Sequence, residues 1–298
     1  MPPPPSGLEV AGEESQADLR LLCVDAYELV AQKLPAEDLP SLRLVSKQWY
    51  HAANKAVRLF GKPGFFSKSQ LAHLHLAAQK FSGLSTLDLT FLPLHNTSPY
   101  VKMLMPLTSL QNISMYYLAA QKADGWALLQ QQKCLTTFRA VCLEYGAEAG
   151  IQDPFVLKVA SLCTLVSLDM SLSSRVTDTG LRSLSCLTNL MSLELPVSKY
   201  EASFSANSLS VFTALTRLTF LSLRGWPVND VDVNTLTCVT SLQHLGLSEC
   251  EHLTCLCFMP LLQFPNLNTV EIVRGDDWMT DAIVTMFEFL RPSIKLVL

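Results

Sequence analysis

The chain has 298 residues, of which 49% are hydrophobic and 16% charged, and its net charge is −4 at pH 7. This composition favours a folded chain over a disordered one. Lys and Arg are scattered, and no basic stripe interleaved with aromatic residues is present, so nucleic acid is not an expected partner. The longest apolar run, 253–264, contains a proline and is too short to cross a bilayer, so we expect no membrane contact.

Cysteine usage and the first residues bear on the cell compartment. The chain has nine cysteines, an odd number with no regular spacing, and most of them, such as Cys163, Cys186 and Cys238, lie in apolar repeat contexts. Such cysteines are typical of reduced, buried thiols. The chain starts on a run of prolines without the basic and apolar segments of a secretory signal. We therefore expect a cytoplasmic protein, with the nucleus and the cytoskeleton as further possible locations.

The first 60 residues contain two different segments. Residues 1–17 are rich in Pro, Gly, Glu and Ser and are predicted to form a disordered tail. Residues 18–60 are predicted to form a small domain of three helices. The first helix carries an apolar stripe and ends before Pro35, the second covers 39–45, and the third follows Ser46 as its N-cap.

A motif lies across the second of these helices. The segment Lys33–Trp49 reads KLPAEDLPSLRLVSKQW, with a Leu-Pro pair, an acidic pair and a Leu-Arg-Leu-Val-Ser-Lys run before the tryptophan. In order and spacing it resembles the F-box family. The resemblance implies that this domain docks onto the adaptor subunit of a cullin-based, SCF-type ubiquitin ligase. The residues implied for that contact are Leu22, Leu34, Pro35, Leu39, Leu42, Val45 and Trp49. Alternatively, the helices only cap the open end of the repeats that follow.

Residues 61–298 are dominated by one repeated phrase, clearest in Leu242–Cys250, with leucine or a similar apolar residue at relative positions one, four and six. Successive starts are 24 to 30 residues apart, in or just beyond the range of about 20–29 residues of leucine-rich repeats. The alternation predicts a short strand with one buried face, and stacked repeats bury those faces together. The phrase starts at Leu84, Leu110, Leu135, Leu165, Leu190, Leu218, Leu242 and Leu267.

Between the strands, residues 178–186, 207–214 and 281–290 carry apolar residues at helical spacing, and Asp178 and Asp281 are predicted to cap two of these helices. The segments VTDTGLRSL and LSECEHLT resemble the cysteine-containing subtype of leucine-rich repeat. The resemblance implies an α/β solenoid of about eight to nine repeats, with a curved parallel β-sheet on the concave face and helices on the convex face. Residues 57–60 and 294–298 are predicted to form the first and last strands.

Position nine of the phrase varies between repeats. It is Cys250 in one repeat, but Leu92, Ser173 and Trp226 in others. A regular internal ladder of Asn or Cys side chains is therefore not expected. The indole of Trp226 has two possible positions, inside the solenoid or at its rim.

No catalytic signature is present, since the chain lacks a Walker loop, GxGxxG, GxSxG and HExxH. We therefore expect a protein that is not an enzyme. One group of soft ligands has a composition that suits zinc, but the apolar residues between its members favour the core, so we expect no metal and no cofactor. Its members are Cys250, His252, Cys255 and Cys257.

The outward side chains of the predicted strands, at positions three, five and seven, define a binding face. Most are small and polar. Those expected to bind a partner are Tyr116, Arg139, Asp169, Glu194, Phe220, Arg224, His244 and Glu271. Aromatic and arginine side chains are the usual anchors of protein interfaces, so Phe220, Arg224 and His244 are predicted to form the centre. The alternative is a featureless, solvated sheet with binding elsewhere.

These features predict a non-catalytic substrate-recognition subunit of an SCF-type ligase, in which the repeats hold an unidentified target protein. Two other functions stay open. One is a structural or scaffold protein, for example on a cytoskeletal or axonemal assembly, whose first helices only cap the solenoid. The other, more distant, is an enzyme or metal protein built on the cysteine group. The sequence does not identify the target.

Overall fold

The structure is a computed structural model that describes residues 59–60, 84–90, 101–102, 104–142, 150–170, 175–196, 208–272 and 280–298. All these ranges belong to one compact unit, made of residues 59–79 and 84–298. The predicted tail and nearly all of the predicted three-helix domain lie outside the described residues, and so do all seven residues predicted to contact an adaptor.

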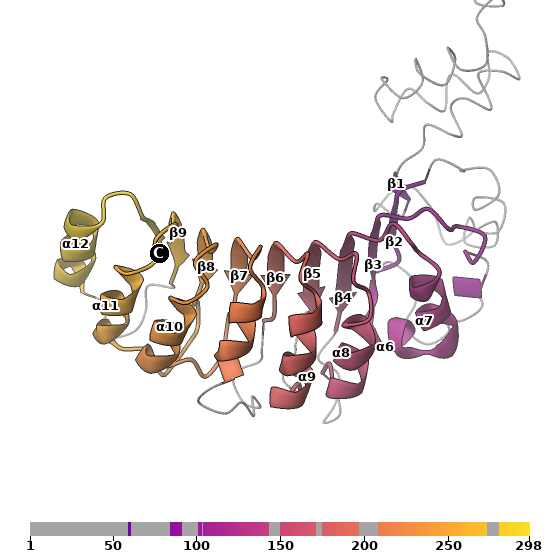
Figure 1. The fold of residues 1–298 in the computed structure, drawn as a ribbon, viewed down its shortest axis with the longest axis horizontal. Coiled ribbons are helices and arrows are strands. Elements are labelled where there is room, and N and C mark those ends of the chain that lie inside the picture. Colours follow the sequence, from indigo (N-terminus) through magenta and orange to yellow (C-terminus); the bar gives the residue numbers. More distant parts are fainter. Residues whose placement is uncertain are drawn as a thin grey trace, which may run out of the picture. The chain divides into compact units, whose positions relative to one another are not determined.

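The described unit is built on a single parallel sheet whose ten strands follow one another in chain order (Figure 1). Eight of the strands coincide with the eight repeat phrases, and one more lies at each end of the row, as predicted. The strands are β1 (Leu59–Phe60), β2 (Thr86–Asp88), β3 (Asn112–Tyr116), β4 (Thr137–Val141), β5 (Ser167–Met170), β6 (Ser192–Glu194), β7 (Phe220–Ser222), β8 (His244–Gly246), β9 (Thr269–Glu271) and β10 (Lys295–Val297).

The register of the sheet follows the repeat phrase position by position. Between β7 and β8, for example, Leu221 pairs with Leu245, and the position-three residues Phe220 and His244 pair beside them. A slip of one residue would turn every leucine outward, so burial of one face fixes this register. The side chains at positions one, four and six of all eight repeats are at most 2% exposed. The predicted apolar spine is confirmed.

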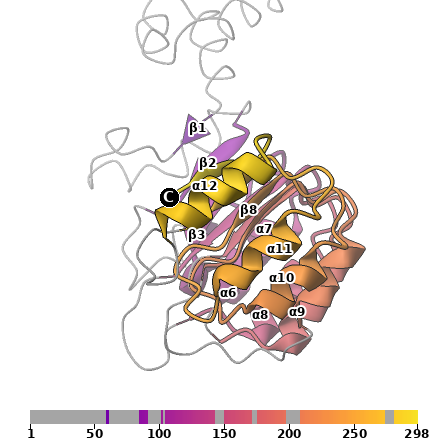
Figure 2. The same ribbon diagram turned by 90° about the vertical axis from the view of Figure 1, so that its left-hand side faces the viewer.

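Helices cover the other face of the sheet, as Figures 1 and 2 show from two sides, so the fold is the predicted leucine-rich-repeat solenoid. Several return segments are short or form 3-10 turns. The helices are α6 (Tyr117–Gln121), α7 (Ala123–Gln130), α8 (Asp153–Val159), α9 (Asp178–Ser183), η4 (Leu184–Cys186), η5 (Ser208–Ala214), α10 (Asp230–Leu236), η6 (Cys255–Cys257), α11 (Phe258–Leu261) and α12 (Asp281–Leu290). None of the described helices is long and apolar enough to span a membrane.

The N-caps of two helices differ from the predicted ones by one residue. The cap of α9 is Thr177, whose side chain accepts a hydrogen bond from the backbone N–H of Thr179, and the cap of α12 is Thr280. Asp178 and Asp281 are instead the first helical residues. There their negative charge still favours the positive end of the helix dipole.

A carboxylate–threonine link joins neighbouring repeats at the start of their return segments. The Asp153 carboxylate accepts hydrogen bonds from the backbone N–H and the hydroxyl of Thr177, at 2.7 and 2.5 Å. The Asp230 carboxylate accepts the same pair of bonds from Thr254, at 3.0 and 2.6 Å. Each link fixes a helix start to the next repeat, 24 residues further along the chain.

Position nine makes the same contact in two repeats through different side chains. The indole N–H of Trp226, which is 1% exposed, donates to the carbonyl of Leu195. The thiol of Cys250 lies 3.3 Å from the carbonyl of Leu223. Both carbonyls belong to position six of the preceding repeat. The side chains vary as expected, and Trp226 occupies the interior position.

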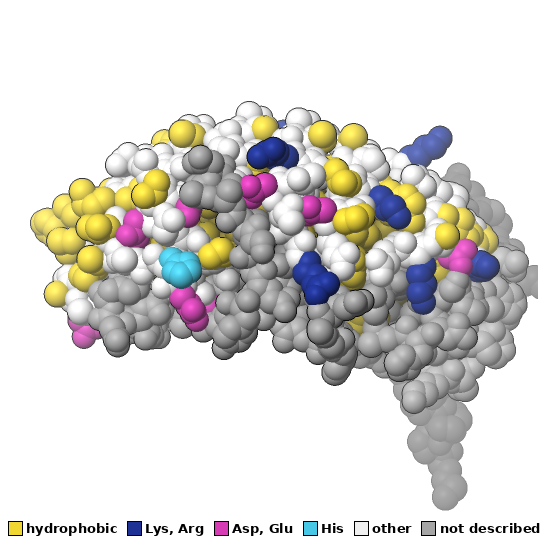
Figure 3. Space-filling view, turned by 90° about the horizontal axis from the view of Figure 1, so that it is seen from below, with side chains coloured by type: hydrophobic (Ala, Val, Ile, Leu, Met, Phe, Trp, Pro, Cys, Tyr) yellow, Lys and Arg dark blue, Asp and Glu magenta, His cyan; other side chains and the backbone are white. Residues whose placement is uncertain are grey.

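Apolar side chains gather on the surface at the end of the solenoid that carries α11 and α12 (Figure 3). In α12, Phe287 is 1% exposed and packs against Phe258 with the ring centroids 4.8 Å apart and the rings tilted by 45°. Phe289, two residues further, is 84% exposed. The helix therefore buries one face and presents apolar residues on the other.

Candidate protein-binding surface

The eight residues predicted for partner binding all lie at positions three, five or seven of their repeats, on or next to strands β3 to β9. Their side chains point away from the helices because the neighbouring positions four and six point into the spine. Tyr116 ends β3 and is half-buried beside Val141 of β4. Arg139 and Asp169 form an ion pair on β4 and β5, and Glu194 lies on β6. Phe220 and His244 form a ring stack on β7 and β8, with Glu271 on β9 beside it, and Arg224 forms a second ion pair after β7.

Arg139 and Asp169 form an ion pair across neighbouring strands. They occupy position five of β4 and β5 and are register partners. The Arg139 Nε atom lies 2.7 Å from the Asp169 carboxylate, and the two side chains are 55% and 20% exposed. The charge of Arg139 is therefore already matched by its neighbour.

Glu194 lies next in the same row, on β6, directly beside Asp169. Burial raises the pKa of the Glu194 carboxyl above its ordinary value, and the nearby Asp169 and Glu271 carboxylates raise it further, while Arg139 opposes the rise. Among the residues that the structure describes, no hydrogen bond or ion pair to Glu194 is formed. Its negative charge is thus poorly compensated.

Phe220 and His244 form a flat stack on β7 and β8. Their ring centroids are 4.3 Å apart with an angle of 12° between the planes. On the next strand, a carboxylate oxygen of Glu271 lies 3.3 Å from His244 Nε2. The geometry does not make a hydrogen bond, and within the described part of the chain this buried nitrogen has no hydrogen-bond partner.

Two small residues, Ser222 on β7 and Gly246 on β8, separate the Glu194 and Glu271 carboxylates in the row of position five. The strands are packed closely here, because a Cβ atom on Gly246 would lie 3.1 Å from the Ser222 hydroxyl. The sheet therefore carries no bulky side chain at these two places.

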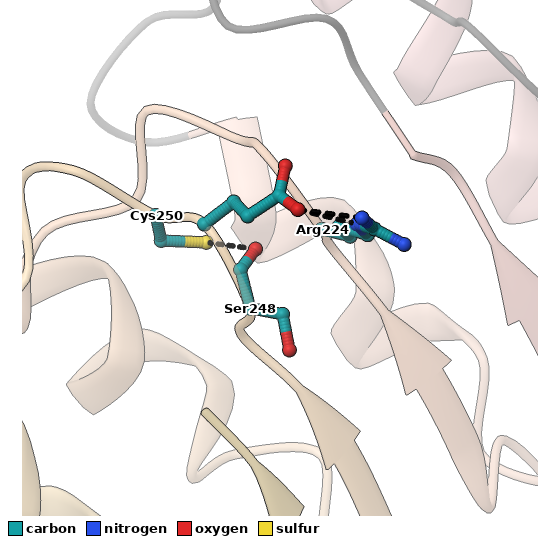
Figure 4. A network of polar contacts seen from close by, with 4 residues as sticks. Arg224, Ser248 and Cys250 are labelled. Atoms are coloured by element: carbon teal, nitrogen blue, oxygen red, sulfur yellow. Dashed lines mark hydrogen bonds and ion pairs between the residues drawn. The ribbon is translucent and has the colours of Figure 1, made fainter. Parts of the chain in front are cut away.

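Arg224 does not join the ring stack. It follows β7 and pairs with Glu249 in the turn after β8, with nitrogen–oxygen distances of 2.5 and 3.1 Å, beside Ser248 and Cys250 (Figure 4). Position seven is four residues beyond position three, about 13 Å along an extended strand. The structure therefore brings Phe220 and His244 together and leaves Arg224 at the strand end.

Glu249 was not foreseen from the sequence. It has a positive φ of 62°, and Gly225, at the same position eight of the preceding repeat, has a φ of 76°. A left-handed backbone suits glycine, so the alignment of Gly225 with Glu249 was the available signal. From this turn the Glu249 side chain forms its ion pair with Arg224.

The cysteine group does not form a metal centre. Cys250 and Cys257 are buried, whereas His252 and Cys255 are exposed. The expectation of buried thiols is wrong for Cys163, Cys186 and Cys238, which are exposed. Within the described ranges there is no group of three or more His, Cys, Asp or Glu side chains that could hold a metal ion. Burial raises the pKa of the Cys257 thiol far above its ordinary value, with the Asp230 carboxylate adding to the effect, so this thiol stays protonated.

One family is found by comparison of the sequence with protein-family models. Residues 19–60 match the F-box domain. All seven residues predicted for adaptor contact lie within the matched segment. No curated protein sequence matches the chain.

Among solved structures, the chain resembles one chain of the TLR13–ssRNA13 complex, with a TM-score of 0.50 and 21% identity over 75% of this chain and 30% of that one. Weaker similarity, with a TM-score of 0.44 and 16% identity, relates it to a chain of the Rad7–Elc1 complex of yeast, over 92% of each chain. An internalin from Listeria monocytogenes has a TM-score of 0.42 and 16% identity, over 92% and 93% of the chains. At this identity the TLR13 likeness concerns the solenoid fold alone.

Proposed function

We propose that this chain, which joins an F-box domain to a leucine-rich-repeat solenoid, is a non-catalytic substrate-recognition subunit of a cullin-based, SCF-type ubiquitin ligase. The observation that carries the proposal is the F-box match at residues 19–60, followed directly by a sheet with one solvent-facing side. An F-box indicates a contact with an adaptor subunit, and the sheet offers a separate surface for a target.

The two parts have distinct physical tasks. The F-box is about 40 residues long, a length at which a domain buries little core of its own and gains stability from a partner. The solenoid keeps a target close to the ligase and so raises the effective concentration of its lysines. Neither task needs an acid, base or nucleophile in this chain. A cytoplasmic or nuclear location is part of the proposal.

The experiment is a direct binding measurement between the purified full chain and a Skp1-type adaptor subunit. The double variant Leu34→Ala/Pro35→Ala is expected to weaken binding at least tenfold, because apolar anchors dominate such interfaces. The matched control is Phe289→Ala/Leu290→Ala, which removes two exposed apolar side chains from the opposite end of the chain and is expected to bind normally.

Two results would contradict the proposal. A wild-type chain that does not bind the adaptor at micromolar concentration has no ligase role of this kind. Equal binding by wild type and the Leu34/Pro35 variant would place the contact elsewhere. In either case the alternative, a scaffold protein whose first helices cap the solenoid, becomes the better account.

A further inference from the structure

We propose that the concave face from β6 to β9 binds an arginine side chain from an extended segment of the target protein. This inference rests on the proposed role as a target receptor and names the chemistry of what is received. The guanidinium group would lie over Ser222 and Gly246, between the carboxylates of Glu194 and Glu271 and beside the stacked rings of Phe220 and His244.

The charge along the sheet is the first argument. From β4 to β9, position five carries one cation, Arg139, and three carboxylates, Asp169, Glu194 and Glu271. Arg139 is paired with Asp169 at 2.7 Å. Glu194 on β6 and Glu271 on β9 are the other two. Burial raises the pKa of the Glu194 carboxyl, and repulsion by the Asp169 and Glu271 carboxylates raises it further, while a Glu271 oxygen lies 3.3 Å from His244 Nε2. A cation supplied by a partner relieves this repulsion.

The shape of the surface is the second argument. Between the two carboxylate-bearing strands, β7 and β8 carry only Ser222 and Gly246 at position five. Adjacent strands are about 4.8 Å apart, so a group above these residues is flanked on both sides by an acidic strand. Ser222 is half-buried and Gly246 is buried, so a group placed here would contact the Ser222 hydroxyl and the backbone, with the Phe220 and His244 rings beside it.

The stacked rings indicate which cation fits best. Phe220 and His244 lie nearly parallel, and both are half-buried at position three, two residues from Ser222 and Gly246. Because the two rings face each other, a group above Ser222 and Gly246 would contact their edges. A planar guanidinium fits such a narrow site and donates fork-like hydrogen bonds to carboxylates, which an ammonium group cannot do in the same way. A metal ion is a poor alternative, since the described residues bring no three of its usual ligands together.

The test starts from a random peptide library displayed on phage and selected on the immobilised full chain. Peptides selected by wild type are expected to be enriched in arginine. Synthetic copies in which citrulline replaces that arginine, keeping the shape but removing the charge, are expected to bind at least tenfold more weakly by fluorescence anisotropy. Lysine copies are expected to lie between the two.

Protein variants locate the contact. Glu194→Gln/Glu271→Gln keeps the size of both side chains and is expected to weaken binding of the arginine peptide at least tenfold and to reduce its salt dependence. The matched control is Glu251→Gln/Glu288→Gln, which removes two exposed carboxylates outside the strands and is expected to bind within twofold of wild type. Thermal unfolding of each variant shows that the fold is kept.

Selected peptides without arginine enrichment, or equal binding of the arginine and citrulline copies, would overturn the proposal. Undiminished binding by the Glu194/Glu271 variant would do the same. Adaptor binding is measured on the same preparations, so the two ideas fail separately. If the chain selects arginine peptides but does not bind the adaptor, only the proposed ligase role is contradicted. If the chain binds the adaptor but its peptide binding does not depend on arginine, only the proposed arginine-binding surface is contradicted.

Discussion

The indole N–H of Trp226 donates a hydrogen bond to the backbone carbonyl of Leu195, one repeat earlier and 31 residues away in sequence. Both residues are fully buried. In the next repeat the smaller Cys250 takes the same place and contacts the carbonyl of Leu223. In these two repeats position nine therefore supplies a donor through different residues, and a buried carbonyl without a partner would be costly.

Trp226→Phe is expected to destabilise the fold by about 1–3 kcal/mol, since it removes the donor and leaves the buried carbonyl unsatisfied. Urea unfolding followed by circular dichroism measures this cost. The control is Trp126→Phe, the same substitution at a half-buried site in α7, which is expected to cost less than about 1 kcal/mol. Equal costs at the two tryptophans would show that the Leu195 contact contributes nothing.

The turn after the strand gives a second prediction. Gly225→Ala is expected to cost about 1–2 kcal/mol, because it places a side chain at a left-handed backbone position with a φ of 76°. Glu249→Gly, at the equivalent position, removes the same strain and loses only a solvent-exposed ion pair worth about 0–1 kcal/mol. It is therefore expected to leave stability unchanged or raise it. The unfolding midpoints of both variants check this, and a loss of stability in Glu249→Gly would contradict it.

The strands could be predicted from the sequence because the same pattern of buried apolar residues recurs in every repeat. Every strand from β2 to β9 coincides with a phrase such as Leu242/Leu245/Leu247, whose spacing allows only one buried face. The secondary structure of the segments between the strands is harder to predict. The predicted helix at 207–214 is a 3-10 segment, η5, and a short apolar pattern does not distinguish the two kinds of turn.

The binding face was predictable in its outline but not in its contacts. Position and strand direction place Phe220 beside His244, and these residues do stack. The pairing of Arg224 with Glu249 depends on a left-handed turn at a glutamate, which local sequence rules disfavour. Whether these residues hold a partner stays a prediction. The residues predicted to contact an adaptor, such as Leu34, lie outside the described residues. Their predicted role is therefore supported by the F-box match alone.

A further prediction concerns how the last helix, α12, packs at the end of the solenoid. Phe287→Ala is expected to cost about 3–5 kcal/mol, because this ring is 1% exposed and packs against Phe258. Phe289→Ala, the same substitution two residues later, is expected to change stability by less than about 0.5 kcal/mol, because that ring is 84% exposed. Chemical unfolding of both variants distinguishes the two faces. Similar costs at both positions would mean that α12 packs through a different face.

The Glu194 carboxylate gives a prediction that depends on pH. Its pKa is raised in the folded chain, chiefly by burial and then by Asp169, so the folded state favours the protonated form more than the unfolded state does. By linkage, Glu194 lowers stability as the pH rises above the ordinary carboxyl value of 4.5. Glu194→Gln mimics the protonated form at every pH.

This variant is expected to unfold at a higher temperature than wild type at pH 7 and at the same temperature near pH 4, where the glutamate is itself protonated in both states. Thermal unfolding across this pH range measures the difference. The control is Glu288→Gln, which removes an exposed carboxylate on α12. A lower melting temperature for Glu194→Gln at pH 7 would mean that the ionised carboxylate stabilises the free chain. The surface between β6 and β9 would then hold no uncompensated negative charge for a cationic partner to neutralise.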